Sequence, residues 1–285
     1  MKLLLTGGKG MLGRTLQRHF QQHELFIADL PEVDIADVRS VERAVGKFKP
    51  DVVIHAAAMT RVDACESDAD AAFRVNALGS ACVARAAARH GARVIAVSTD
   101  YVFDGGLDRP YHEFDAPAPR TVYGASKLAG EEAVRRHCPD HTIVRIAWLY
   151  GEGGPSFLHT MLALGAQEGA PLKVVDDQLG NPTSTDAAAG LIARLLETPI
   201  PGVVHGTCEG EVTWYGFARE IFRCAGLTRA LEPCTTAAFP RPAPRPANSR
   251  LEKRMLRLAG LPPMPHWQAE VERFVATTQW SQPRA

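Results

Sequence analysis

Two side chains four residues apart have the chemistry of an acid–base pair. Tyr123 and Lys127 stand in the segment Tyr-Gly-Ala-Ser-Lys. If this segment is helical, residues four apart lie on one face, and both side chains can reach the same ligand. A phenol ordinarily has a pKa of ~10, and a nearby ammonium stabilises the phenolate and lowers that pKa. We therefore expect Tyr123 to exchange a proton with a substrate oxygen and Lys127 to tune Tyr123.

A hydroxyl group that could hold the same oxygen follows an apolar run at residues 94–97. This run continues as Ser98-Thr99-Asp100-Tyr101. Sheets with helices on both faces bind ligands at the carboxyl ends of their strands. Successive strand residues face opposite sides, so only one of the two hydroxyls can face the ligand. We predict Thr99 as the third catalytic residue, whose hydroxyl bonds to the substrate oxygen, with Ser98 as the alternative.

A glycine-rich turn at the start of the chain predicts a dinucleotide site. Gly7, Gly10 and Gly13 follow the apolar residues 3–5 and lead directly into a helical pattern. Gly7 permits a tight turn, Gly10 lets a pyrophosphate approach, and Gly13 lets the helix pack closely on the strand. The helix N-terminus then offers unpaired N–H groups to the phosphates.

The cofactor's adenosine ribose should meet an acidic residue at the end of the second strand. Asp29 stands there, directly after residues 25–28. A carboxylate at this point favours a free 2′-hydroxyl and disfavours a 2′-phosphate, which favours NADH over NADPH. Lys9 and Arg14 could still neutralise a 2′-phosphate. The sequence thus leaves both cofactors open.

The elements that must position these groups alternate along the first half of the chain. Apolar runs predict strands at residues 3–5, 25–28, 52–55, 94–97 and 142–146. Helical patterns fall at residues 11–22, 41–48, 69–90 and 123–136. Continuous apolar strands are typical of a parallel sheet covered by helices on both faces. The predicted fold class is α/β, with a doubly wound parallel Rossmann-type sheet.

The last third of the chain predicts a smaller C-terminal substrate lobe. From about Trp148 the alternation loosens, and then a helix at 186–197 and a strand near 203–205 resume it. Residues 239–246 are rich in proline, which favours extended chain. The predicted division is a dinucleotide-binding domain at 1–147 and 186–208, and a substrate-binding lobe at 148–185 and 209–285.

Composition excludes several other classes of protein. Lys plus Arg and Asp plus Glu both number 32, so no overall charge favours nucleic acid or an anionic membrane. The six cysteines are scattered without metal-ligand spacing, which is typical of reduced thiols in the cytoplasm. No apolar run approaches the ~20 residues of a membrane span. We expect a cytoplasmic protein that binds neither nucleic acid nor membrane.

Together these motifs resemble one family. The glycine turn, Thr99 and the Tyr123/Lys127 pair are similar to those of the extended short-chain dehydrogenase/reductases. Within them the chain most resembles the dTDP-4-dehydrorhamnose reductase family. The similar segments are residues 56–66, 98–105, 122–131, 145–151, 177–183, 213–215 and 245–251.

The resemblance implies the reaction and further site residues. The reaction would be NADPH- or NADH-dependent reduction of the C4 keto group of dTDP-4-dehydro-L-rhamnose to dTDP-L-rhamnose. Thr99, Tyr123 and Lys127 would be catalytic. Cofactor contacts would include Gly10, Met11, Leu12, Asp29, Asp34, Ile35, Ala58, Met59 and Thr60. The dTDP-linked deoxysugar would meet Thr99, Asp100, Trp148, Asn181, Arg245 and Asn248.

The sequence departs from the family at two places. Members often carry an aromatic residue or His where Met59 stands, which makes the contact there uncertain. Some members dimerise around magnesium bound by a carboxylate early in the first helix. Arg14 and Thr15 offer no carboxylate, so we predict no metal site. Whether the chain is a monomer or a homodimer stays open.

Three other functions compete with this one. The substrate could be another dTDP-4-keto-6-deoxyhexose. The chain could be a nucleotide-sugar dehydratase or epimerase. Dehydratases usually carry Asp-Glu after the strand-end Thr, whereas Tyr101 follows Asp100 here. The chain could also be a non-catalytic, NADP-binding regulatory subunit, because the β subunit of methionine adenosyltransferase resembles the same family.

Overall fold

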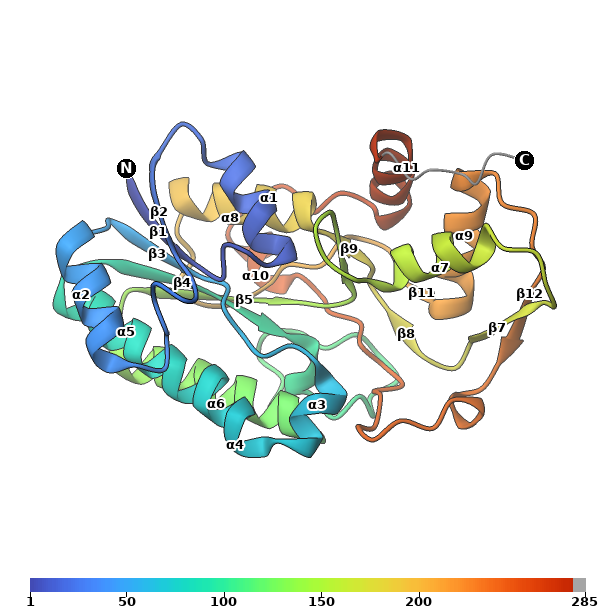
Figure 1. The fold of residues 1–285 in the computed structure, drawn as a ribbon, viewed down its shortest axis with the longest axis horizontal. Coiled ribbons are helices and arrows are strands. Elements are labelled where there is room, and N and C mark those ends of the chain that lie inside the picture. Colours follow the sequence, from blue (N-terminus) through green and yellow to red (C-terminus); the bar gives the residue numbers. More distant parts are fainter. Residues whose placement is uncertain (279–285) are drawn as a thin grey trace.

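A six-stranded parallel sheet forms the centre of the computed structural model, which describes residues 1–278 (Figure 1). The strands run in the order β10-β5-β4-β3-β1-β2, and each pairs in parallel with its neighbours. Their bounds are β1 (Lys2–Thr6), β2 (Glu24–Ala28), β3 (Val52–His55), β4 (Arg93–Thr99), β5 (His141–Ile146) and β10 (Gly202–His205). From β1 the chain adds β2 on one side and then β3 on the other. Strand order therefore reverses between β1 and β3, where sheets of this type bind ligands.

Helices cover both faces of the sheet, which explains the continuous apolar strands. One face carries α1 (Met11–His19) and α8 (Thr185–Glu197), and the other carries α2 (Val38–Phe48), α5 (Gly79–Arg89) and α6 (Val122–His137) (Figure 1). Leu3 and Leu5 of β1 pack in the core on the α1 side, and Leu4 packs in the core on the α5 side. The predicted doubly wound α/β fold is confirmed.

The helix predicted over 69–90 contains a wider turn. It consists of α4 (Ala69–Phe73), a π-helical turn at Arg74–Leu78, and α5. The buried side chain of Asn76 lies in this turn and pairs with both backbone groups of Met59, at 2.8 and 3.1 Å. Inserted π turns often occur at functional sites. Regular periodicity in the sequence does not reveal such a turn.

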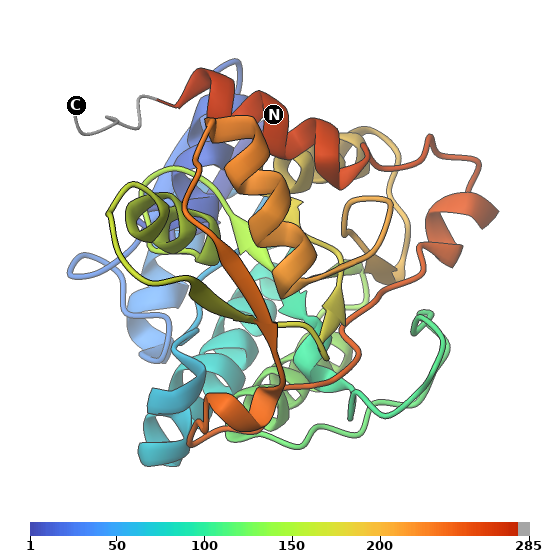
Figure 2. The ribbon, with the colours of Figure 1, turned by 90° about the vertical axis from the view of Figure 1, so that its right-hand side faces the viewer.

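Short strand pairs and helices form the part of the molecule beyond the carboxyl ends of the strands. Figure 2 shows this side, with β7 and β12 paired in front of α9. The remaining helices are α3 (Val62–Ser67), α7 (Phe157–Gly165), α9 (Trp214–Ala225), α10 (Arg254–Leu258) and α11 (Trp267–Thr277). The short strands are β6 (Leu149–Tyr150), β7 (Leu172–Val175), β8 (Leu179–Gly180), β9 (Thr183–Ser184), β11 (Val212–Thr213) and β12 (Leu231–Cys234). Short 3-10 turns lie at Asp100–Val102 and Thr236–Ala238.

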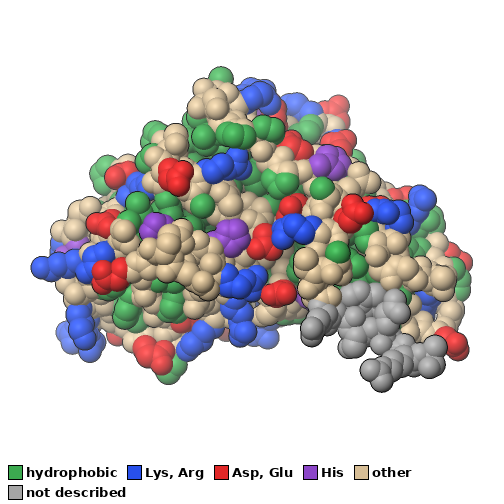
Figure 3. All heavy atoms as spheres, turned by 90° about the horizontal axis from the view of Figure 1, so that it is seen from above, with side chains coloured by type: hydrophobic (Ala, Val, Ile, Leu, Met, Phe, Trp, Pro, Cys, Tyr) green, Lys and Arg blue, Asp and Glu red, His purple; other side chains and the backbone are tan. Residues whose placement is uncertain are grey.

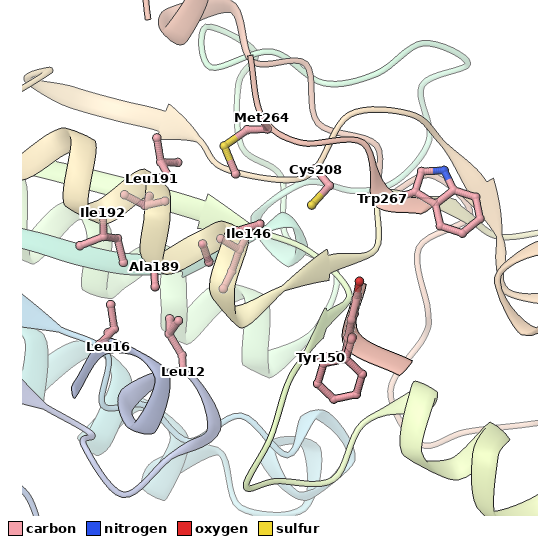
Figure 4. Packing of buried hydrophobic residues seen from close by; sticks show 14 of the residues in the cluster. Leu12, Leu16, Ile146, Tyr150, Ala189, Leu191, Ile192, Cys208, Met264 and Trp267 are labelled. Carbon is pink, nitrogen blue, oxygen red and sulfur yellow. The ribbon is translucent and has the colours of Figure 1, made fainter. Parts of the chain in front are cut away.

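One apolar core joins the sheet to this second region. In Figure 4, Leu12 and Leu16 of α1 face Ala189 and Ile192 of α8, and the same cluster continues to Tyr150 and Trp267. Helix α10 packs back on edge strand β10. The predicted division into two lobes stays a prediction.

The surface carries both signs of charge. Figure 3 shows basic and acidic side chains interspersed over the face seen from above. Among residues 1–278, no helix is long and apolar enough to cross a membrane.

Candidate active site

A cavity of about 590 Å³ opens at the carboxyl ends of the central strands. Its wall combines the glycine turn after β1, the residues that follow β2, β3, β4 and β5, and the first turns of α6. The predicted site residues in this wall are Gly7, Gly10, Met11, Leu12, Gly13, Asp29, Asp34, Ile35, Ala58, Thr60, Thr99, Asp100, Tyr123, Lys127 and Trp148. The fold thus brings the three residues predicted for catalysis and all those predicted for the cofactor except Met59 to one cavity.

The glycine turn has the geometry of a phosphate cradle. Gly7 has a φ of +72°, a left-handed conformation that favours glycine. A Cβ on Gly13 would lie 2.1 Å from the Gly7 carbonyl oxygen, so helix α1 can pack this closely only with glycine there. A Cβ on Gly10 would meet only that same oxygen, at 3.2 Å, and the approach to Gly10 is otherwise open. The N-terminus of α1 can therefore receive an anion.

Charges of both signs border the adenosine end of the cavity. The Asp29 carboxylate accepts hydrogen bonds from the backbone N–H groups of Lys9 (2.7 Å) and Leu30 (2.8 Å). The Lys9 ammonium bonds to the Leu30 carbonyl oxygen and lies 3.5 Å from Glu32. Asp34 pairs with Arg74 at 3.2 Å. Asp29 is thus held in place at the end of β2, with a cation beside it.

The two adjacent hydroxyls at the end of β4 face opposite sides, as expected of a strand. Ser98 donates to Glu131 at 2.6 Å, inside a buried ion-pair cluster. The Thr99 hydroxyl donates to Asp100 at 3.0 Å and lies near enough to the Tyr123 phenol to act on its pKa. The hydroxyl beside the phenol is therefore that of Thr99.

Helix α6 presents Tyr123 and Lys127 to the cavity. Its N-cap is Thr121, whose hydroxyl accepts the Gly124 N–H at 3.0 Å. A Cβ on Gly124 would lie 2.1 Å from the Tyr101 carbonyl oxygen, so glycine lets α6 begin close to the end of β4. The Lys127 ammonium donates to the Val97 carbonyl oxygen at 2.8 Å.

The protonation of this pair differs from the sequence interpretation. We expected Lys127 to lower the pKa of Tyr123. Burial instead raises the pKa of the phenol above its usual range, against the opposing effect of its hydrogen bond with Thr99. Burial also lowers the pKa of Lys127 to about 8. Desolvation disfavours the charged form of each group, and it therefore favours the neutral phenol of Tyr123.

Two further predicted substrate contacts line the cavity. Asp100 is buried, and burial raises the pKa of its carboxyl to about 6. Trp148 lies two residues after the end of β5 and has a φ of 48°. Both residues line the same cavity as Thr99 and Tyr123.

Four predicted site residues are not in the cavity wall. Met59 packs against a buried cluster that contains Tyr123. Arg245 pairs with Asp63 at 2.8 Å and lines a second cavity, of about 260 Å³, which shares Tyr101 with the first. The amide of Asn181 bonds to the backbone of Gly210 and Leu251, and that of Asn248 bonds to the backbone of Leu107 and Arg109.

Sequence reasoning missed two residues that support the site. Asn76 donates to the Ser126 hydroxyl at 2.9 Å, which links the π turn to α6 between Tyr123 and Lys127. The sequence feature that could have indicated Asn76 is a polar residue on the buried side of an Ala-rich helix. The indole of Trp214 stacks on Trp148, and no spacing in the sequence connects the two.

This fold and this site define a Rossmann-type nucleotide-binding protein with a Tyr-x-x-x-Lys pair at the mouth of its dinucleotide cradle. A family model described as RmlD substrate binding domain matches residues 1–280. The chain belongs to this family, which confirms the resemblance.

Similar proteins agree over nearly the whole chain. The dTDP-4-dehydrorhamnose reductase of Streptomyces griseus is 44% identical over 283 residues, covering 96% of this chain and 93% of that protein. The spore coat polysaccharide biosynthesis protein SpsK of Bacillus subtilis is 40% identical, covering 96% of each chain. A dTDP-4-dehydrorhamnose reductase structure from Bacillus anthracis, in complex with NADP, matches with a TM-score of 0.94 and 38% identity, covering 97% of this chain and 99% of that one.

Proposed function

We propose that this chain reduces the C4 keto group of dTDP-4-dehydro-L-rhamnose to dTDP-L-rhamnose, with NADPH or NADH as the reductant. The observation that carries the proposal is the meeting of Thr99, Tyr123 and Lys127 in one cavity with the glycine cradle at Gly10. The similar proteins named dTDP-4-dehydrorhamnose reductase support the choice of substrate.

The cavity fits a nicotinamide dinucleotide. Gly7, Gly10 and Gly13 would hold its pyrophosphate at the N-terminus of α1, and Asp29 would hold the adenosine ribose. Further contacts would come from Met11, Leu12, Asp34, Ile35, Ala58 and Thr60, with Met59 supporting the wall from behind. When bound, the reduced nicotinamide supplies the hydride.

The protein's own groups handle the proton and the carbonyl oxygen. Tyr123 donates its phenolic proton to the oxygen as negative charge develops there, and its raised pKa keeps that proton in place until then. Thr99 holds the same oxygen by a hydrogen bond. Lys127, charged below about pH 8, stabilises the phenolate that forms and orients the nicotinamide ribose.

The substrate contacts divide into two kinds. Asp100 and Trp148 would touch the sugar directly, because both line the cavity. Arg245 would reach the nucleotide diphosphate from the adjoining cavity. Asn181 and Asn248 would act by holding the neighbouring backbone segments in place. We also propose a cytoplasmic location, which the six free thiols support, and a monomer or homodimer as the working form.

A related reductase activity is the second candidate. A protein of Streptomyces antibioticus, named probable dTDP-4,6-dihydroxy-2-methyloxan-3-one 4-ketoreductase, is 41% identical over 276 residues. The substrate could accordingly be another dTDP-linked 4-keto sugar. A panel of such sugars, compared by kcat/KM, separates the candidates.

The function is tested with the purified chain alone. Incubation with dTDP-4-dehydro-L-rhamnose and stoichiometric NADPH or NADH should oxidise one cofactor per sugar reduced. A dehydratase or epimerase would recycle the cofactor instead, and a regulatory subunit would consume none.

Asp29→Asn should shift cofactor preference toward NADPH. The N–H groups of Lys9 and Leu30 bond to separate oxygens of the carboxylate, so the amide keeps an acceptor for only one of them, and it removes the charge that opposes a 2′-phosphate. We expect the ratio of kcat/KM for NADPH to that for NADH to rise about tenfold. Two such charges near a protein surface repel each other with an interaction free energy of a few kcal/mol at most, and this limits the size of the effect. The matched control is Glu32→Gln, which removes a nearby carboxylate outside the cavity wall. An unchanged ratio in Asp29→Asn would show that this carboxylate does not face the ribose.

The reaction should lose rate as the pH rises through about 8. The lowered pKa of Lys127 means that its charged form is present below that pH and is lost above it. Because kcat/KM reports groups of the free enzyme, its pH profile for NADPH should fall on the alkaline side with this midpoint. A profile that stays flat through this range, with the protein still folded, would contradict the assigned role of the ammonium.

A further inference from the structure

The backbone of Trp148 has a conformation that a bulky residue adopts only when its surroundings hold it there. Its φ of 48° lies in the left-handed region, which is uncommon for residues other than glycine and costs free energy. Its carbonyl oxygen accepts a hydrogen bond from the Thr183 N–H at 3.2 Å. Contacts of the indole must supply the remaining free energy that holds this backbone conformation.

The indole of Trp214 lies flat on that of Trp148. The ring centroids are 3.4 Å apart and the planes differ by 9°. Trp214 is the first residue of α9, and its position is fixed by the N-cap Thr213, whose hydroxyl accepts the Gly216 N–H at 3.1 Å. Trp148 lines the main cavity and Trp214 does not. The stack on Trp148 therefore connects Trp214 to the cavity wall.

A buried glutamine fixes the orientation of the second indole. Gln178 accepts the Trp214 indole N–H at 3.0 Å and donates its own amide to the Thr236 hydroxyl at 2.9 Å. Thr236 is in turn held by the carboxylate of Asp177. Both ends of the Gln178 amide are thus occupied, so the ring plane of Trp214 has little freedom to turn.

The backbone of a glycine, Gly180, lies against the indole of Trp148. A Cβ on Gly180 would stand 2.3 Å from Cε2 of Trp148, closer than real atoms approach. Strand β8, which contains Gly180, pairs with β11 just before Trp214, in the register Val212 with Gly180. Trp148 is therefore held by Trp214, at the start of α9, and by Gly180 on β8.

We propose that Trp214 is a positioning residue for substrate binding, which acts by fixing the Trp148 indole as a rigid wall for the sugar. Gln178 and Gly180 complete this arrangement. The inference rests on the proposed function, because it assigns the wall to the sugar end of the cavity. A ring already held in its bound position loses no freedom when the sugar packs on it, so the benefit falls on sugar affinity.

The test compares variants of the stack in the full chain. In Trp214→Leu and Gln178→Leu we expect the KM for dTDP-4-dehydro-L-rhamnose to rise about three- to tenfold, the usual worth of an aromatic pair. The rate constant kcat should change less, and the Kd for NADPH should not change. The far-ultraviolet circular dichroism couplet of two stacked indoles should disappear in Trp214→Leu. Trp214→Phe should restore part of the affinity.

The matched control is Trp267→Phe, which alters a core indole outside the cavity wall and should leave KM and the couplet unchanged. A double-mutant cycle with Trp148→Ala decides whether Trp214 acts through Trp148. We expect Trp214→Leu to cause no further rise in KM once Trp148 is alanine. An equal rise in KM in the wild-type and Trp148→Ala chains would overturn the inference. If the wild-type chain is active and Trp214→Leu has the same KM for the sugar, the inference is also overturned. A wild type that does not reduce the sugar would instead overturn the proposed function, and the inference with it.

Discussion

Tyr123→Phe should lower turnover by about 10²–10⁴-fold, the usual worth of one acid–base group. The variant keeps the ring that packs beside Tyr101 and removes only the hydroxyl next to Thr99. The carbonyl oxygen then has no proton donor when charge develops on it. Cofactor affinity should stay largely intact, because the glycine cradle and Lys127 are unchanged. Steady-state kinetics with the keto sugar and a fluorescence titration with NADPH measure the two quantities.

The control for this variant is the same substitution at another buried tyrosine. The Tyr150 hydroxyl is buried away from the cavity wall and has no hydrogen-bond partner among the described residues. Tyr150→Phe should therefore keep its turnover. If Tyr123→Phe also kept most of its turnover, the proton donor would have been assigned to the wrong residue.

Glu131→Ala should lower the free energy of unfolding by about 3–5 kcal/mol, the usual cost of breaking a buried ion pair. Glu131 lies on α6 one turn beyond Lys127 and is 2% exposed. Its oxygens accept from Arg145 Nε at 2.8 Å and Nη2 at 2.7 Å, as well as from Ser98. Removing the carboxylate leaves the buried Arg145 guanidinium without its counter-charge. Chemical denaturation measures the change.

The neighbouring residue on the same helix provides the comparison for Glu131→Ala. Glu132 is exposed, so Glu132→Ala should change stability little. Equal denaturation midpoints for the two variants would show that the buried pair adds nothing to stability. The cluster also explains the choice between the two hydroxyls, because Ser98 serves Glu131 and only Thr99 is left for the phenol.

The sequence predicted best what depends on local pattern. The glycines at 7, 10 and 13, the apolar strands and the Tyr123/Lys127 spacing each carry their own geometric reason. Ligands bind at the carboxyl ends of the strands in such sheets, and this placed Thr99 and Asp29 at the same edge of the sheet. The three glycines, Asp29, Thr99, Tyr123 and Lys127 all line one cavity in the structure.

What escaped prediction depends on tertiary contacts. The pKa of Tyr123 follows from how deeply α6 is buried, which a spacing of residues does not reveal. The stack of Trp148 on Trp214 joins residues from separate elements. The amides of Asn181 and Asn248 bond to backbone groups that only the folded chain brings within reach, and their contact with the substrate stays a prediction.

The most direct test of the central claim follows the hydride itself. The purified chain is incubated with dTDP-4-dehydro-L-rhamnose and NADPH or NADH deuterated at C4 of the nicotinamide, and the product is examined by mass spectrometry and NMR. The account predicts one deuterium at C4 of dTDP-L-rhamnose for each cofactor oxidised, at a rate that Tyr123→Phe reduces sharply. Unlabelled product, or cofactor returned to its reduced form at the end of turnover, would contradict it.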